Sequence, residues 1–108
     1  MFFLSPKKDI NEGLKEYRNT PDAVLLDVRT KKEVIYGVIP GSINLPLNKL
    51  KSAPHVIDDF DTPVFTYCIS GARADKAAKR LRRMGYRNAK SIGGLTGYTG
   101  KLKKSILR

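Results

Sequence analysis

The sequence contains one cysteine, one histidine and no tryptophan among its 108 residues. A lone cysteine forms neither an internal disulfide nor a Cys-x-x-Cys redox pair. With His55 as the only histidine, the chain has too few residues for an ordinary zinc site of four cysteine and histidine ligands. We therefore expect no structural metal, and nothing in the sequence calls for a cofactor. The position of the single thiol, Cys68, is what needs an explanation.

Long apolar runs are missing as well. No segment approaches the ~20 apolar residues that span a bilayer, so we expect no membrane association. The first four residues are too short for a signal-peptide core and lead directly into Ser5, Pro6 and two lysines, which favours a cytoplasmic location. With 41% apolar and 29% charged residues, the chain has the composition of a soluble globular protein. Its length predicts one domain over residues 1–108.

Acidic residues are scarce, since 10 Asp and Glu stand against 21 Lys and Arg, for a net charge of +11. Such an excess is common in nucleic-acid-binding proteins. The basic residues of the last third are not interleaved with aromatic side chains as a base-stacking platform requires, so we expect no specific nucleic-acid binding. A positive field that attracts small anions, or plain solubility, explains the charge more simply. The sequence carries no signal for an oligomeric state.

Apolar runs typical of buried strands alternate with helical patterns. Residues 23–26 and 64–67 are predicted as buried strands, and shorter strands are predicted within 42–46 and 89–92. Helices are predicted from about residue 10, or one turn earlier after Ser5 and Pro6, then from residue 31 to Gly37, over 74–84, and within 95–107. Residues 47–57 have only loose helical spacing. This order predicts an α/β fold, with a small central, mostly parallel sheet flanked by helices on both faces.

Cys68 follows the predicted strand 64–67, at the end of a parallel sheet where binding sites form. Residues 68–73 then connect this strand to the next helix. Their N–H groups can converge on one point, the helix N-terminus adds positive charge, and Gly71 supplies conformational freedom. Such a loop favours a thiolate without a histidine base. The alternative is a buried structural cysteine that acts as a small apolar residue.

A thiolate in an anion-binding loop suits attack on phosphorus or on sulfane sulfur. Cysteine phosphatases hold five residues between cysteine and arginine, whereas four, Ile69 to Ala72, separate Cys68 from Arg73. The tighter loop favours sulfur over a phosphatase or arsenate-reducing chemistry. With no second cysteine, a persulfide on Cys68 must pass its sulfur to an outside acceptor.

Three motifs in order resemble those of the rhodanese family of sulfurtransferases. Residues 27–29 with Glu33 resemble its D-V-R…E signature, residues 37–46 its G-H-I-P-G-A-x-N-x-P motif, and residues 68–73 its C-x-S-G-x-R active-site loop. Residues 77–95 resemble its closing segment, so the resemblance runs from about Ser5 to Tyr98.

This resemblance implies a two-step transfer of sulfane sulfur. Cys68 would take sulfur from a small anionic donor such as thiosulfate and pass it to cyanide or a thiol. The substrate-binding residues implied are those of the loop, Ile69, Ser70, Gly71, Ala72 and Arg73. Arg73 would bind the donor or brace the loop, with a solvated helix-start arginine as the alternative.

Asp27, Arg29 and Glu33 are expected to support the site structurally. A carboxylate and a guanidinium near a strand end can tie neighbouring loops together by charge-assisted hydrogen bonds. We predict that Arg29 pairs with Glu33.

The sequence departs from the family pattern at three positions. Val38 replaces the histidine of G-H-I-P-G. Tyr98 is near the position at which members of the family frequently have a tryptophan. Ile69 stands where many active members carry a basic or polar residue, so we expect thiosulfate to be a poor donor and a less anionic persulfide, or a protein partner, to serve instead. The competing hypothesis is a non-catalytic or regulatory module that binds a protein.

Overall fold

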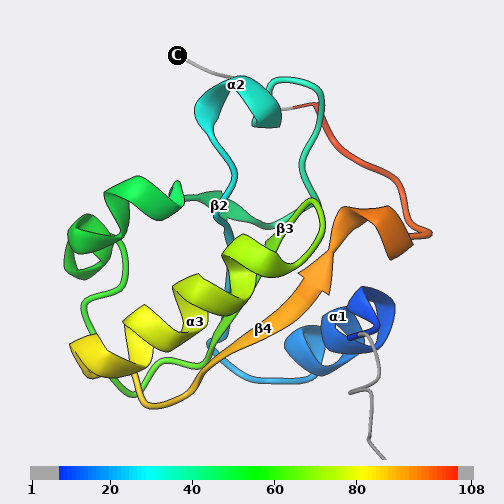
Figure 1. Ribbon diagram of the computed structural model, residues 1–108. Helices are drawn as coiled ribbons and strands as arrows, with labels where there is room; N and C mark the ends of the chain where they lie inside the picture. The colour runs from blue at the N-terminus through cyan, green and yellow to red at the C-terminus, as the bar shows by residue number, and fades with distance from the viewer. Residues whose placement is uncertain (1–7, 105–108) are drawn as a thin grey trace, which may run out of the picture.

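The structure is a computed structural model that describes residues 8–104. Its centre is a four-stranded sheet in the order β2-β1-β3-β4 (Figure 1). Every pair of neighbouring strands in it is parallel. The strands are β1 (Val24–Asp27), β2 (Ile43–Asn44), β3 (Val64–Cys68) and β4 (Ala89–Gly94). The predicted α/β class with a parallel sheet is therefore confirmed.

Helices cover both faces of the sheet, also as predicted. One apolar cluster joins β1 and β3 to α3 (Ala72–Met84) and to the 3₁₀ helix η1 (Leu47–His55). The other joins the opposite sheet face to α1 (Ile10–Arg18) and the short 3₁₀ turn η2 (Leu95–Gly97). Figure 1 shows α3 and α1 on these two sides. None of the helices in the described part of the chain is both long and apolar enough to cross a membrane.

The burial of the two central strands explains their composition. All five residues of β3 are buried, and three of the four in β1. A strand covered on both faces needs a continuous apolar run rather than alternation, which is the pattern that predicted both strands. β2 has only two residues because Pro46 follows it closely and prolines limit pairing.

Side-chain caps fix where the first two helices begin. Asp9 accepts a hydrogen bond from the Asn11 N–H and starts α1 at Ile10; the alternative start after Ser5 and Pro6 lies outside the described residues. In α2 (Lys31–Val34), Thr30 and Glu33 form both bonds of a capping box. This second cap was predicted correctly, and it places the Glu33 carboxylate near the sheet edge.

The prediction was wrong at three places along the second half of the chain. The expected helix over 95–107 is only η2, after which the chain extends and Lys103 forms an antiparallel bridge with Val38; residues 105–107 lie outside the described part. Gly94 at the start offers no side-chain cap, and Gly97 and Gly100 weaken helix propagation. β4 extends through Gly93 and Gly94, which were expected to form a loop. Helix α3 begins at Ala72 instead of residue 74.

Candidate active site

Cys68 is the last residue of β3 and lies beneath the first turn of α3. Its side chain is 1% exposed. The sulfur accepts hydrogen bonds from the backbone N–H of Gly71 at 3.0 Å and of Ala74 at 3.4 Å. Two amides therefore point at the sulfur, and both belong to the segment that turns from the strand into the helix. Such an arrangement stabilises negative charge at the sulfur position.

The connecting loop is shorter than the sequence indicated. Only Ile69, Ser70 and Gly71 separate the strand from the helix, because Ala72 and Arg73 already belong to the first turn of α3. Gly71 has a φ of +104°, a conformation in which a side chain is strained. This geometry lets the chain reverse within three residues and turn the Gly71 N–H back toward Cys68. Ile69 is 38% exposed at the outside of the turn.

The end of β4 closes against this loop. Gly94 pairs with Cys68 in the sheet, and the Thr96 N–H donates to the Ile69 carbonyl at 3.2 Å. A Cβ at Gly94 would collide with that same carbonyl, so only glycine allows the approach. Gly93 and Gly94 were predicted as a loop, and this contact was not predicted. The paired glycines were the available signal, since glycine in a strand marks a close backbone approach.

Thr66 fixes the helix to the strand from inside the core. Its hydroxyl donates to the Ala74 carbonyl at 2.8 Å, and the residue is completely buried. Because Ala74 also supplies one of the N–H groups to Cys68, this bond sets the distance between sulfur and helix. No local pattern indicates this role in advance, because threonine is common in any strand.

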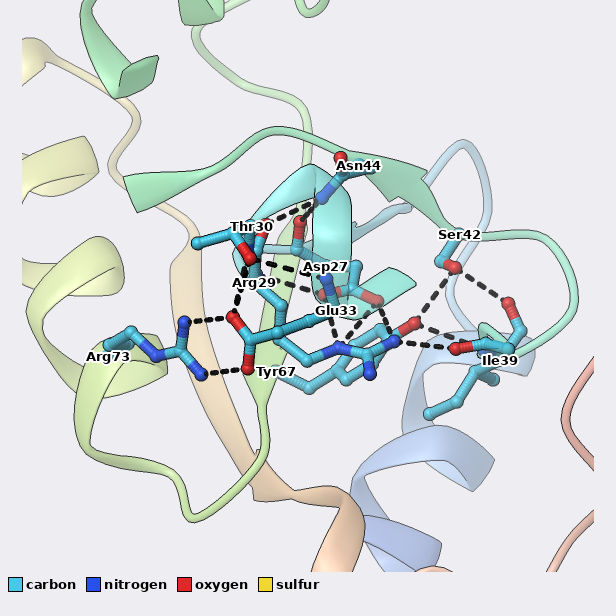
Figure 2. Close-up of polar contacts among 10 residues, drawn as sticks. Asp27, Arg29, Thr30, Glu33, Ile39, Ser42, Asn44, Tyr67 and Arg73 are labelled. Carbon is cyan, nitrogen blue, oxygen red and sulfur yellow. Dashed lines mark hydrogen bonds and ion pairs between the residues drawn. The ribbon is translucent and has the colours of Figure 1, made fainter. Parts of the chain in front are cut away.

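Arg73 and Glu33 form a two-pronged ion pair (Figure 2). The two terminal nitrogens of Arg73 donate to the two carboxylate oxygens of Glu33 at 2.6 and 2.8 Å. Thr30 donates to Glu33 through both its N–H and its hydroxyl. The hydrogen bonds from Arg73, opposed by partial burial, lower the pKa of Glu33 to about 2. The Arg73 guanidinium is thus turned toward α2 and braces the start of α3, rather than extending into solvent.

The predicted pair between Arg29 and Glu33 is wrong. Arg29 instead binds Asp27, with its NH2 nitrogen 2.6 Å from Oδ2, and also donates to the Gly37 carbonyl at 2.7 Å. Both side chains are buried, whereas Glu33 is occupied by Arg73. Burial opposes the charge on Arg29, but the hydrogen bond and attraction from Asp27 outweigh it and raise its pKa. Asp27 and Arg29 together hold the segment after α2 against the end of β1.

Tyr67 and Asn44 complete this polar network (Figure 2). The Tyr67 hydroxyl accepts from the Ile39 N–H at 3.1 Å and donates to Ser42 at 2.9 Å, and burial strongly raises its pKa. The Asn44 amide donates to the carbonyls of Asp27 and Arg29. These contacts fasten residues 37–44 to the sheet. They give Ile39, Ser42 and Asn44 of the second motif a structural role.

A pocket of about 860 Å³ lies on the β4 side of the loop. Ser70, Gly71 and Ala72 form one wall, Gly93 and Gly94 another, and Lys8 and Asp75 pair across it at 3.4 Å. Within the described residues, no group of three or more His, Cys, Asp and Glu side chains is placed to hold a metal ion.

A family model of the rhodanese-like domain matches residues 11–101. The chain belongs to the rhodanese-like family. The resemblance drawn from the three motifs is thereby confirmed at the level of the family.

Curated relatives are longer proteins. A tRNA uridine(34) hydroxylase of Xanthomonas euvesicatoria is 35% identical over 81 residues, which are 69% of this chain and 33% of that protein. The adenylyltransferase and sulfurtransferase UBA4 of Meyerozyma guilliermondii is 32% identical over 93 residues, 79% of this chain and 22% of that protein. The chain therefore spans a third or less of these relatives.

Solved structures of similar size share the fold. A rhodanese with anions from E. coli has a TM-score of 0.71 and 27% identity, covering 77% of this chain and 99% of its own. The human single-domain sulfurtransferase TSTD1 has a TM-score of 0.70 and 25% identity, covering 87% of this chain and 95% of its own. Both matches cover more than three quarters of this chain.

Proposed function

We propose that this chain is a thiosulfate sulfurtransferase-type enzyme that carries sulfane sulfur as a persulfide on Cys68. The observation that carries the proposal is the pair of backbone N–H groups, from Gly71 and Ala74, directed at the Cys68 sulfur. These donors would stabilise the thiolate before transfer and the charged persulfide after it. The family membership and the similarity to a single-domain sulfurtransferase support the same chemistry.

The reaction proceeds in two displacements. The Cys68 thiolate attacks the outer sulfur of thiosulfate, the S–S bond breaks, and sulfite leaves with the electron pair. The acceptor, cyanide or a thiolate, then attacks the outer sulfur of the Cys68 persulfide and returns the cysteine as a thiolate. In each step one nucleophile replaces another on the transferred sulfur atom, so no oxidant or reductant is consumed.

The loop residues have different roles in this mechanism. We expect the backbone of residues 69–72 to surround the transferred sulfur. Of its N–H groups, that of Gly71 already contacts the Cys68 sulfur, and Arg73 braces the following helix turn through Glu33. The side chain of Ile69 at the exposed turn is apolar, so no positive charge at this position helps to bind the thiosulfate dianion. Since Cys68 is 1% exposed, the donor must present its sulfur at the tip of a slender group. A persulfide meets both conditions better than thiosulfate.

The test measures sulfur transfer with and without the thiol. The protein and a Cys68→Ser variant are incubated with thiosulfate and cyanide, and thiocyanate is followed; in parallel, intact mass is recorded after exposure to a small persulfide donor. We expect a single-sulfur adduct that is absent from the variant, together with slow thiocyanate formation that the substitution abolishes. Turnover that survives in Cys68→Ser would contradict the mechanism. An unmodified wild-type mass after every donor would instead favour a non-catalytic binding module.

We do not propose hydroxylase activity for this chain, because the chain covers only 33% of the tRNA uridine(34) hydroxylase named above. Phosphatase activity is disfavoured because four residues, rather than the five of cysteine phosphatases, separate Cys68 from Arg73. We expect no hydrolysis of an aryl phosphate.

A further inference from the structure

Helix α3 carries a row of cations along its exposed side. The row lies at positions i, i+3, i+4 and i+7, which share one face of a helix and span about 10 Å along its axis. All four side chains are exposed: Lys76, Lys79, Arg80 and Arg83. The opposite side of α3 is buried against the sheet through alanines and one leucine. The row, which we call the α3 basic row, therefore faces outward as a unit.

No side chain in the described part of the chain neutralises this row by an ion pair. The six ion pairs found there involve other cations. The one acidic residue of α3, Asp75, is bound by Lys8. Like charges three and four residues apart destabilise a helix by a few tenths of a kcal/mol per pair. The protein thus keeps an unfavourable cluster that an external anionic surface would stabilise.

The α3 basic row begins beside the proposed site. α3 begins at Ala72, directly after the turn that follows β3, and Lys76 comes one helical turn later. Ile69, an exposed apolar side chain in the turn that leads into α3, directly follows Cys68 in the chain. An apolar contact flanked by charges is the usual arrangement of a protein–protein interface, with an apolar centre and a polar rim.

We propose that the α3 basic row docks an acidic protein segment that carries the thiol or persulfide with which Cys68 exchanges sulfur. This inference rests on the proposed function and names its partner. A protein fits better than RNA for two reasons. The single cysteine requires an outside sulfur acceptor, and a protein can supply a thiol for this purpose whereas RNA cannot. The side chain at the turn beside Cys68 is apolar Ile69, which suits a protein contact better than a phosphate.

Docking would bring the sulfur atoms together without changing the chemistry. The Cys68 thiolate attacks the outer sulfur of the segment's persulfide, and the S–S bond of that persulfide breaks. Its electron pair stays on the inner sulfur, which leaves as the segment's thiolate. The reverse step returns sulfur to a thiol segment. Both directions conserve the number of persulfides.

The probe for the test is a helical peptide with glutamates at i, i+3, i+4 and i+7 and one terminal cysteine, converted to its persulfide. A matched peptide has glutamines in place of the glutamates. Transfer to Cys68 is followed by intact mass at low and at raised salt. Because opposite charge steers association, we expect the acidic peptide to react at least about tenfold faster, with the advantage lost at high salt.

Two variants of equal net charge locate the effect. One neutralises the α3 basic row (Lys76→Gln, Lys79→Gln, Arg80→Gln, Arg83→Gln), and the control neutralises four exposed lysines elsewhere: Lys31, Lys32, Lys101 and Lys104. The row variant should lose the advantage and the control should keep most of it, with thermal unfolding confirming that both are folded. Equal losses in the two variants would overturn the proposal, because net charge alone would then act.

Two further outcomes separate the competing explanations. A small uncharged persulfide donor should modify the wild type and both variants at the same rate; if it modifies none of them, the proposed function itself fails. If the donor works but the acidic peptide has no advantage over the glutamine peptide, the docking proposal fails alone. An RNA oligonucleotide that binds the wild type but not the row variant, in the absence of any peptide advantage, would reassign the surface to RNA.

Discussion

Arg73 and Glu33, 40 residues apart in the chain, are joined by two parallel hydrogen bonds of 2.6 and 2.8 Å. The bond pair ties the first turn of α3 to the capping box of α2. Together with the bond from Thr66 to Ala74, it fixes the helix end whose N–H groups contact Cys68. The geometry around the sulfur therefore depends on a residue that belongs to another helix and contacts no substrate.

Arg73→Lys tests this bracing role. A lysine keeps the charge but cannot form two parallel bonds, so the first turn of α3 loses its fixed orientation. We expect persulfide formation to slow about tenfold, while the free energy of unfolding falls by only about 1 kcal/mol because the pair is one-third exposed. The control is Arg87→Lys, whose exposed pair with Asp61 lies away from the loop. Equal rates in wild type and Arg73→Lys would show that the ion pair does not position the site.

Glu33 predicts a pH dependence of stability. Its pKa is lowered from 4.5 to about 2 in the folded protein, so the folded state binds this proton more weakly than the unfolded state. The stabilisation is complete above the unfolded value, declines as the pH falls through the interval between the two values, and is absent below about 2. Urea unfolding of wild type and Glu33→Gln at several pH values measures it. The stability difference should be constant near neutral pH and should shrink within that interval; a constant difference down to pH 2 would contradict this account.

The buried pair of Asp27 and Arg29 should be sensitive to loss of one partner. Arg29→Met leaves a buried carboxylate without its guanidinium, and we expect a loss of about 3–5 kcal/mol in the free energy of unfolding. The double variant Asp27→Asn, Arg29→Met removes both charges and should be less destabilised than the sum of the single changes. Chemical denaturation of the four proteins completes the cycle. Strict additivity would mean that the two side chains are not energetically coupled.

Gly94→Ala tests the contact between β4 and the loop. The added methyl group would meet the Ile69 carbonyl, so strand or loop must shift and the backbone around Cys68 with it. We expect a loss of about 1–3 kcal/mol in stability and a larger loss of sulfur transfer. Gly97→Ala is the matched control, because no atom lies within 4 Å of a Cβ there. Unfolding midpoints and single-turnover persulfide formation give the two readouts, and normal transfer in Gly94→Ala would remove this glycine from the site.

Ile69→Lys tests the cause of donor preference. A cation at the exposed turn would attract thiosulfate, and an exposed charge contact of about 1 kcal/mol corresponds to roughly fivefold in KM. We expect a lower KM for thiosulfate, unchanged kcat, and no effect on a neutral persulfide donor. Val56→Lys, an equally exposed position on another element, controls for net charge. The same gain in both variants would assign the effect to the overall field.

The sequence predicted the features that depend on local patterns. The buried strands follow from continuous apolar runs, and the Thr30–Glu33 capping box from four residues in a row. The partners of Arg29 and Arg73 could not be assigned in this way, because two acidic and two basic groups at strand and helix ends admit several pairings. The choice is made by burial: Asp27, at the end of the inner strand β1, is buried together with Arg29, which leaves Glu33 for Arg73.

The paired glycines illustrate a different limit. Gly93 and Gly94 have the composition of a loop, and only the approach of the Ile69 carbonyl shows why a strand contains them. The segment after Gly97 was misread for the related reason that its extended path depends on Val38, a residue far away in the chain.

The pairing of Cys68 with Gly94 also determines the order in which the site is completed during folding. Each neighbouring strand pair in the sheet is parallel, so no hairpin can nucleate it, and among the strands of residues 8–104 β4 comes last in the chain. Until that strand docks, the thiol at the end of β3 has no backbone wall beside it and is open to oxidants. Cysteine oxidation should therefore be fastest in chains that have not yet added their final strand, which makes the rate of β4 docking a determinant of how much active protein is formed.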